Sequence, residues 1–552
     1  FGSRGQGACL AQSLMLLTAM VTSLIGVAKS QQAGYVHSEQ QPPIVVKRCT
    51  KADGCFVEPT SVTIDAQWRW LHDGSASYHS CFEGIGWDQL HCTDPQGCAQ
   101  ACSLDGSSAQ DYESTYGVSA AQDGVELKYV SGGAVGSRLY AMDGGGEQYK
   151  LWRLKNREFT FDVDVSTLSC GLNGALYFVE MPADGGLGRG DNQAGAKYGT
   201  GYCDAQCPHD LKFIDGEANV EGWRLSPGGP IGRYGNCCAE LDIWEANRDA
   251  TAYTVHPCTI EGNMKCEGEP CGDTPAFCDC CDEPECICCG RYKGVCDKDG
   301  CDFNSYRMGE HSFYGFGPNF TVDTRRPVTV VTQFLTDDGT DDGDLVEIRR
   351  LYVQDGRVIN NSFSTVLGRS ASDSISGDYC KAQKGLFQNP DDFTKKGGLK
   401  TMGETLDRGM VLVLSLWDDK LTRMDWLDSS VGGGKFPLSK PGVVRGPCPA
   451  GSGDAQELRK TKGDAFVRYS GISYGEIGST FGPGSERLIY PSKAPSILVL
   501  ATIAIAGMAV CAVAGLFAMG RVRRNHSYSA ESPRSSFVDS ESGIKPLVSP
   551  DD

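Results

Sequence analysis

The sequence predicts an antiparallel β-sandwich, an all-β fold in which two sheets pack face to face. Apolar and polar residues alternate, as half-buried strands require, in the segments 158–165, 175–181, 327–335, 345–353 and 409–417. The chain has 70 glycines, which suit turns between short strands, and it shows no long amphipathic helix. An uncharged segment of 23 residues near the C-terminus, 497–519, adds one predicted transmembrane helix.

Both ends of the chain predict a secreted protein that stays attached to a membrane. An apolar run ends at the small-residue site Ala28-Lys29-Ser30, so residues 1–30 are interpreted as a signal peptide that is removed. Arginines directly follow the apolar segment, which places the tail in the cytoplasm by the positive-inside rule. We therefore expect a type I single-pass protein of the plasma membrane. Its predicted parts are an extracellular domain over 31–484, a linker over 485–496, the span over 497–519 and a disordered tail over 520–552.

The amino-acid composition indicates the cellular compartment and argues against one class of partner. Twenty-six cysteines exceed cytosolic usage and indicate the oxidising secretory pathway. The net charge of −19 argues against nucleic acid as a partner, because phosphate binding needs a basic face. The same charge is compatible with a neutral polysaccharide. We expect a monomer with glycans on the sequons at Asn319 and Asn360.

Two tryptophans are predicted to share one face of a strand. Residues Thr63 to Trp70 have the composition of a strand, and side chains two residues apart on a strand point the same way. Trp68 and Trp70 could therefore be half-buried core or a stacking platform for the flat faces of sugar rings.

The most informative stretch is 240–247, Glu-Leu-Asp-Ile-Trp-Glu-Ala-Asn. On a strand Glu240 and Asp242 share a face, whereas Glu245 lies an odd number of residues away and needs a bulge or a twist to join them. Paired carboxylates are typical of glycoside hydrolysis, in which one attacks the sugar carbon and another, kept protonated, releases the leaving oxygen. Negative charges held close together raise at least one pKa and so supply the acid. From spacing alone, the alternative is a solvated acidic edge strand.

A longer motif favours the catalytic interpretation. Cys237-Cys238-Ala239 precedes the carboxylates, and Val255-His256-Pro257-Cys258-Thr259 follows them. Together these segments resemble the signature of glycoside hydrolase family 7, which contains retaining cellobiohydrolases and endoglucanases. The resemblance runs from about residue 42 to about residue 484. It implies a sandwich of the jelly-roll type with long loops that roof a substrate groove or tunnel across one sheet.

The resemblance implies a role for each acidic residue of the motif. Glu240 would be the nucleophile, and Glu245 would be the general acid and then the base. Asp242 would hydrogen-bond Glu240 and set its orientation, while His256 would line the leaving-group side. The substrate would be cellulose or a related β-1,4-glucan, and neither a cofactor nor a catalytic metal is implied.

The resemblance also implies a set of sugar contacts. The aromatic platforms would be Trp70 near the entrance, Trp68 deeper, Trp417 just before the scissile bond and Trp426 on the product side. The polar contacts would be Arg138, Asn173, Tyr177, Asp204, Gln206, Arg307 and Arg445, although each could instead form a salt bridge on a strand surface. Lys420 and Leu421 stand where tunnel-type members carry tyrosines that help close the roof, which weakens the case for a closed tunnel.

Nine disulfides follow from the same resemblance. They are Cys49–Cys55, Cys81–Cys102, Cys92–Cys98, Cys170–Cys448, Cys203–Cys238, Cys207–Cys237, Cys258–Cys296, Cys266–Cys271 and Cys301–Cys380. Six more cysteines fall in one insertion, 278–289. An even number in an extracellular loop favours three further disulfides over a thiolate metal cluster.

We therefore expect a membrane-tethered, retaining β-1,4-glucan hydrolase that releases cellobiose from cellulose. An open-cleft endoglucanase is the nearest alternative. A wall-binding receptor without catalysis and a structural wall anchor are further alternatives. The complete set of three carboxylates argues against a pure binding protein, because binding needs the tryptophans but no acid and nucleophile pair.

Overall fold

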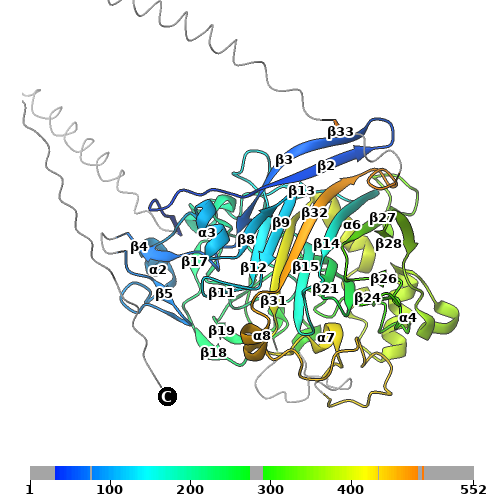
Figure 1. The fold of residues 1–552 in the computed structure, drawn as a ribbon. Coiled ribbons are helices and arrows are strands. Elements are labelled where there is room, and N and C mark those ends of the chain that lie inside the picture. Colours follow the sequence, from blue (N-terminus) through cyan, green and yellow to red (C-terminus); the bar gives the residue numbers. More distant parts are fainter. Residues whose placement is uncertain (1–30, 75–77, 274–289, 433, 483–487, 490–552) are drawn as a thin grey trace, which may run out of the picture. The chain divides into compact units, whose positions relative to one another are not determined.

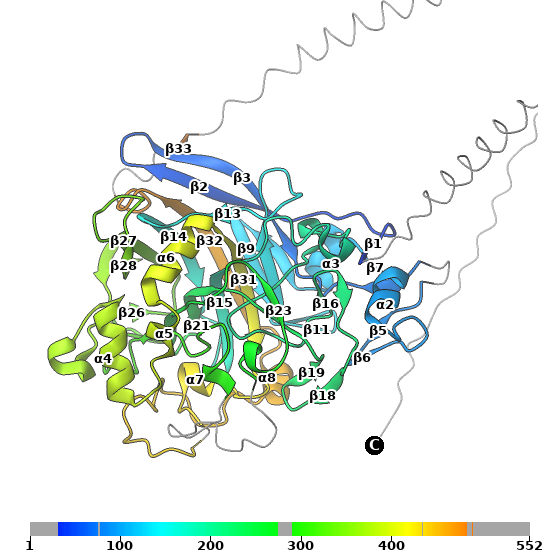
Figure 2. The same ribbon diagram turned by 180° about the vertical axis from the view of Figure 1, so that it is seen from behind.

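The computed structural model contains two β-sheets packed face to face, so the predicted antiparallel β-sandwich is confirmed (Figures 1 and 2). The structure describes residues 31–74, 78–273, 290–432, 434–482 and 488–489. The predicted signal peptide, transmembrane segment and tail, and the cysteine insertion, lie outside these residues. Within them, no helix has both the length and the apolar character that a bilayer crossing requires.

Sheet I carries the acidic motif. Its strands are all antiparallel to their neighbours. Their spatial order is β3 (Gly54–Ile64), β12 (Ser137–Ala141), β31 (Met410–Asp418), β15 (Leu172–Val179), β21 (Glu240–Ala246), β22 (Thr251–His256) and β24 (Cys301–Asn304).

Sheet II stacks against one face of sheet I. Its order is β8 (Val118–Ala121), β9 (Gly124–Lys128), β32 (Phe466–Gly475), β14 (Arg157–Asp164), β27 (Val328–Thr336), β28 (Leu345–Gln354) and β29 (Arg357–Asn360). The long strand β3 joins the sheets, because its last residues pair with β12 while the preceding ones pair with β2 (Pro43–Thr50). Strand β2 in turn pairs with β32, in parallel.

The core lies between the two sheets and is rich in aromatic rings. Trp244 of sheet I meets Phe161 of sheet II edge-on at 6.1 Å between ring centroids. Phe178 meets Phe159 in the same way at 5.2 Å. Such edge-to-face contacts are the favoured geometry for buried aromatic pairs, so these rings fix how the sheets stack.

The five predicted strands are all present, with ends shifted by up to three residues, as β14, β15, β27, β28 and β31. The two longest described helices, α4 (Gly377–Phe387) and α6 (Gly398–Arg408), have only three turns each, which agrees with the expectation of no long amphipathic helix. Two of the five buried side chains of α4 are the polar Gln383 and Lys384, so its inward face mixes apolar and hydrogen-bonding groups.

The predicted strand over residues 63–70 is also wrong. Strand β3 ends at Ile64, and the Asp65 side chain accepts a hydrogen bond from the Gln67 backbone N–H at 2.6 Å, which starts a turn. Arg69 is buried after this turn, where it pairs with Glu39 at 2.5 Å and donates to the Thr63 hydroxyl at 2.8 Å. Trp68 and Trp70 therefore do not project from one strand face.

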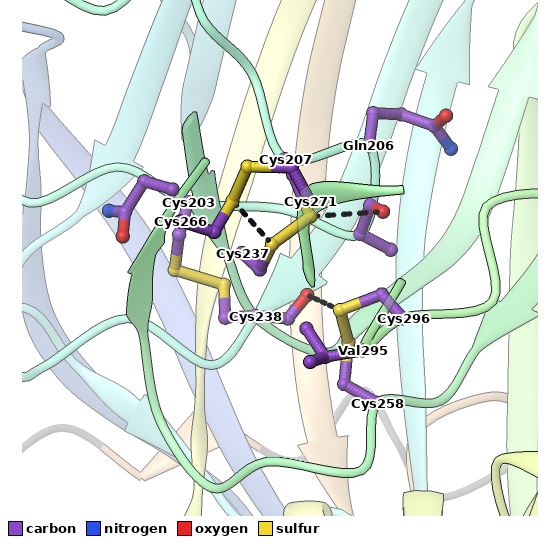
Figure 3. The surroundings of a disulfide bond; sticks show 12 residues. Cys203, Gln206, Cys207, Cys237, Cys238, Cys258, Cys266, Cys271, Val295 and Cys296 are labelled. Atoms are coloured by element: carbon purple, nitrogen blue, oxygen red, sulfur yellow. Dashed lines mark hydrogen bonds between the residues drawn. A yellow bond between two sulfur atoms is a disulfide. The ribbon is translucent and has the colours of Figure 1, made fainter. Parts of the chain in front are cut away.

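All nine disulfides that the resemblance implies are formed. Four of them gather beside the start of β21: Cys203–Cys238, Cys207–Cys237, Cys258–Cys296 and Cys266–Cys271 (Figure 3). Because Cys237 and Cys238 lie just before the acidic motif, this cluster anchors the chain where it enters strand β21.

Candidate active site

A bulge in β21 brings the three carboxylates to one face of sheet I. Two residues, Ile243 and Trp244, separate Asp242 from Glu245, whereas one residue separates their partners on β15 and on β22. Both intervening side chains are buried in the core. Glu245 consequently falls on the same side as Glu240 and Asp242, as the odd spacing in the sequence requires.

We call this side of sheet I the carboxylate face. The strand registers place on it the side chains of Arg138, Tyr140, Asn173, Ala175, Tyr177, Ala252, Thr254, His256, Asp302, Asn304, Val413, Ser415 and Trp417. Five of the predicted site residues outside β21 thus share the face with the carboxylates: Arg138, Asn173, Tyr177, His256 and Trp417.

Glu240 is 8% exposed, and its Oε2 accepts a hydrogen bond from the Ala205 backbone N–H at 3.1 Å. Its other oxygen has no hydrogen bond among the described residues. Burial, followed by the negative charges of Asp242, Asp204 and Glu245, raises the pKa of Glu240 well above its usual range. The fixed N–H group of Ala205 favours the ionised form and occupies the oxygen that would not attack.

Glu245 is equally buried and is held by Asn173. The Asn173 Nδ2 group donates to Glu245 Oε1 at 3.0 Å, and Asn173 Oδ1 accepts from the Ala246 backbone N–H at 3.0 Å. This second bond fixes which end of the amide faces Glu245. Burial and the charge of Asp242 raise the pKa of Glu245 well above its usual range, so it can hold a proton on Oε2.

Asp242 lies between the two glutamates along the strand and pairs with His256. The His256 Nε2 atom is 3.1 Å from Asp242 Oδ2, and His256 Nδ1 donates to the Asp297 carbonyl at 2.8 Å. Burial alone would lower the pKa of His256, but the hydrogen bond and charge of Asp242 outweigh it and raise the pKa to about 9. The imidazolium therefore places a positive charge beside the carboxyl groups at neutral pH.

The arrangement has the parts of a double-displacement hydrolase. It offers one carboxylate with an available oxygen, a second that is suited to hold a proton, and an ion pair that fixes the residue between them. The same burial that raises both pKa values also removes the competing water that would screen these charges.

Two hydroxyl groups form a hydrogen-bonded chain from Tyr177 to Asp204, and a third predicted sugar contact, Arg138, stacks beside it. Tyr202 OH donates to Asp204 Oδ2 at 2.7 Å, so the Tyr177 hydroxyl, 2.9 Å away, donates to Tyr202. Arg138 stacks over the Tyr202 ring at 3.4 Å and forms an ion pair with Asp65 at 2.6 Å. The expectation that some of these residues form salt bridges therefore holds for Arg138.

The remaining predicted contacts come from loops. Gln206 is exposed and donates to the Lys298 carbonyl at 2.8 Å, and Figure 3 shows it pointing away from the disulfides. Trp68 donates from Nε1 to the Gly136 carbonyl at 2.9 Å and packs against the core. Trp70 donates to Ser80 Oγ at 3.2 Å and contacts the His72 ring at 4.2 Å. These two tryptophans keep partly exposed rings, which a platform requires.

On the opposite side, a charge cluster gathers around Asp302. Arg307 forms an ion pair with Asp302 Oδ1, and Arg445 NH1 lies 3.9 Å from Asp302 Oδ2. Burial would raise the pKa of Asp302, but the two arginines lower it to about 2. Trp417 and Trp426 stack nearby in one apolar cluster with Ala252, at 6.3 Å between centroids and 29° between planes.

Sequence reasoning missed Asp65, Tyr202 and Asp302. The four residues Cys301-Asp302-Phe303-Asn304 alternate apolar and polar, a signal that could have marked a strand with Asp302 on its polar side. Asp65 and Tyr202 lie in irregular segments outside the strands, where no periodic pattern marks a functional side chain.

Two loops approach each other from opposite ends of the strands. Strands β21 and β31 run in the same direction, because both are antiparallel to β15. The segment that enters β21 contains the hairpin of β18 (Arg224–Ser226) and β19 (Gly229–Ile231), whereas residues 419–423 leave the far end of β31. A Cβ placed on Gly228 would nevertheless lie 3.7 Å from Cβ of Leu421, so the two loops lie next to each other.

Three groups of cysteines in the described part of the chain have sulfur atoms close enough to share an ion, but every member already belongs to a disulfide. A disulfide sulfur is not a thiolate ligand. The absence of a cofactor stays a prediction.

Comparison with known proteins agrees with this geometry. Residues 33–481 match the model of glycosyl hydrolase family 7. A cellobiohydrolase from Daphnia pulex is 47% identical, with 82% of this chain and 100% of that chain covered and a TM-score of 0.77. A cellobiohydrolase from Melanocarpus albomyces, solved with cellotetraose, is 40% identical over 82% and 99% of the chains, with a TM-score of 0.72. The endocellulase EGI of Humicola insolens is 34% identical over 82% and 100%, with a TM-score of 0.67. The chain therefore belongs to glycosyl hydrolase family 7 and is a glycoside hydrolase.

Proposed function

We propose that the protein is a retaining cellulase that hydrolyses β-1,4-glucosidic bonds from the ends of cellulose chains and releases cellobiose. The hydrolytic part rests on one observation. Three carboxylates share a buried face, and both glutamates have one oxygen held by an N–H donor and a second without a hydrogen bond among the described residues.

In the first step the unbonded oxygen of Glu240 attacks the anomeric carbon, and the bond from that carbon to the bridging oxygen breaks. Glu245 gives its proton to the bridging oxygen, so the released glucan leaves with a hydroxyl group. Asp242, held by its ion pair with His256, lies on the same face as Glu240 and is the residue assigned to orient it. The result is a glycosyl ester on Glu240 with inverted configuration.

In the second step Glu245, now ionised, takes a proton from water, and the resulting oxygen attacks the same carbon. The ester bond to Glu240 breaks, which restores both carboxyl groups to their starting states. Two inversions give net retention.

The close approach of Gly228 and Leu421 supports attack at chain ends. Loops from opposite ends of the strands meet on the side where Trp417, Trp426 and the β31–α7 loop pack on Ala252 of the carboxylate face. A glucan beneath a bridge of this kind must enter by its end. Leu421 takes part in this bridge in place of the tyrosines expected of tunnel-type relatives.

An open-cleft endoglucanase is the second candidate. Leu421 and Leu225 remain 66% exposed, so the bridge has little buried apolar surface and would open easily. An opening bridge would admit the middle of a chain.

We also propose that the enzyme is an extracellular, membrane-tethered monomer with glycans on Asn319 and Asn360. Both asparagines are exposed in the described structure, which a glycan requires. The tether rests on the uncharged segment 497–519 and the arginines after it.

The test follows products from amorphous cellulose treated with the purified full-length protein. We expect mostly soluble cellobiose and few new reducing ends in the solid. Abundant insoluble reducing ends would instead support the endoglucanase, and no products at all would overturn the hydrolase assignment for cellulose.

A further inference from the structure

The edge of sheet I is completed by side chains of a helix. Among the strand pairs of the described structure, β24 pairs with β22 alone, so its outer backbone groups need other partners. Helix α4 supplies them. Lys384 Nζ donates to the Gly300 carbonyl at 2.6 Å, while Gln383 Nε2 and Tyr379 OH donate to the Asp302 carbonyl at 2.5 and 2.9 Å.

The same helix contacts the side chains of the charge cluster. Gln383 Nε2 lies 3.1 Å from Asp302 Oδ1, the oxygen that also pairs with Arg307. The Phe387 ring supports the Arg307 guanidinium from below at 4.1 Å. Residues 379, 383 and 387 are four apart and so lie along one side of the helix, and the disulfide Cys301–Cys380 fastens that side to β24.

Gln383 and Lys384 are almost fully buried, although a polar or charged side chain gains little from burial alone. Gln383 is 1% exposed and Lys384 is 4% exposed. Burial of a polar side chain is costly unless its hydrogen bonds are made, and here those bonds converge on the backbone that carries Asp302. The arrangement fixes Asp302 and, through it, Arg307 and Arg445.

We propose that Gln383 and Lys384 are positioning residues for product binding. They hold the Asp302, Arg307 and Arg445 cluster in the geometry that binds the departing disaccharide. They do not contact the three carboxylates of β21, so they set how tightly cellobiose is retained and leave bond cleavage unchanged. This inference rests on the proposed function, because it takes cellobiose as the product.

The test compares a variant on the buried side of α4 with a variant on its exposed side. Lys384→Met removes the buried ammonium group, whereas Lys381→Met makes the same change on the exposed side of the helix, three residues away. With a chromogenic aryl β-cellobioside and the full-length protein, we expect Lys384→Met to raise the inhibition constant of cellobiose at least about fivefold. The kcat should stay within about twofold of the original protein in both variants.

Two further variants separate positioning from a loss of stability. Gln383→Met should raise the inhibition constant in the same direction, and Lys384→Arg, which keeps the charge, should restore it. A lower melting temperature with an unchanged inhibition constant in both Met variants at 383 and 384 would overturn the proposal. So would an equal rise in the Lys381→Met control.

Calorimetric titration of cellobiose keeps this inference distinct from the proposed function. If the protein fails to hydrolyse the aryl cellobioside, the proposed function is contradicted, yet weaker cellobiose binding by Lys384→Met and Gln383→Met would still support the positioning role. Equal binding by all forms would contradict the positioning role whatever the activity.

Discussion

The two faces of strand β21 are buried to a similar degree but contribute differently, because one stabilises the fold and the other carries the reactive carboxyl groups. On the core side, Leu241, Ile243 and Trp244 pack between the sheets with no more than 1% exposure. On the carboxylate face, Glu240, Asp242 and Glu245 are 5–8% exposed, and two of them have raised pKa values. A raised pKa means that burial opposes the charged form. The carboxylate face therefore lowers the free energy of unfolding, whereas packing of the core face raises it. One strand therefore separates stability and reactivity by the side on which each residue falls.

The largest expected effect comes from removing the nucleophile. Glu240→Gln should lower kcat at least about 10⁴-fold, because no ester can form, while oligosaccharide binding stays largely intact. The same change should raise the free energy of unfolding by about 1 kcal/mol near pH 7, because burial and the neighbouring charge of Asp242 oppose ionisation of Glu240. Kinetics, calorimetric binding and chemical denaturation measure the three quantities. Glu404→Gln, exposed on α6, is the control, and substantial turnover by Glu240→Gln would contradict the assignment.

A substitution on the core side should lower the stability and leave kcat largely unchanged. Leu241→Ala should lower the free energy of unfolding by about 3–4 kcal/mol, because it leaves a cavity between the sheets. The kcat per folded molecule should change little. Leu90→Ala removes the same atoms from a side chain that is 87% exposed and should be nearly neutral. A large loss of kcat in folded Leu241→Ala would show that the two faces are not independent.

Of the two faces of β21, only the carboxylate face carries titratable groups, so only its contribution to stability should depend on pH. The pKa of His256 is raised to about 9 in the folded state from an ordinary value of 6.5. Its pairing with Asp242 therefore contributes fully below pH 6.5 and is lost as the pH rises through about 9. We expect this contribution to reach at most about 3 kcal/mol. Denaturation of the original protein and of His256→Gln at pH 6 and pH 10 measures it, and a difference that does not change with pH would refute the pairing.

The smallest effect should come from the loop over the face. Leu421→Gly removes the side chain that meets Gly228 and should lower the ratio of soluble to insoluble reducing ends by about twofold. Leu438→Gly is the control, since that leucine is also 66% exposed. An unchanged ratio would mean that this contact does not decide where chains are cut.

The sequence was a good guide where a periodic pattern or a covalent constraint decides the structure. Period-two alternation located β14, β15, β27, β28 and β31. The odd spacing between Glu240 and Glu245 indicated a bulge. Prediction from the sequence failed where local hydrogen bonds decide the structure. Asp65 ends β3 early by capturing the Gln67 N–H, and no alternation in the composition reveals this. Helix α4 was not located from the sequence because its inward face mixes apolar residues with Gln383 and Lys384, whose hydrogen-bond partners lie about 80 residues away in the chain.

The bulge in β21 also makes strand pairing part of the enzyme's chemistry. Ile243 is the additional residue that neither neighbouring strand matches. If the same residues paired in a regular ladder without the bulge, Glu245 would turn into the hydrophobic interior and Trp244 would turn outward. Deletion of Ile243, in contrast, would leave a regular ladder that keeps Glu245 on the carboxylate face and Trp244 in the core. The register of β21 against its two neighbours, and not the identity of the residues alone, therefore decides which side chains of the motif can meet a substrate.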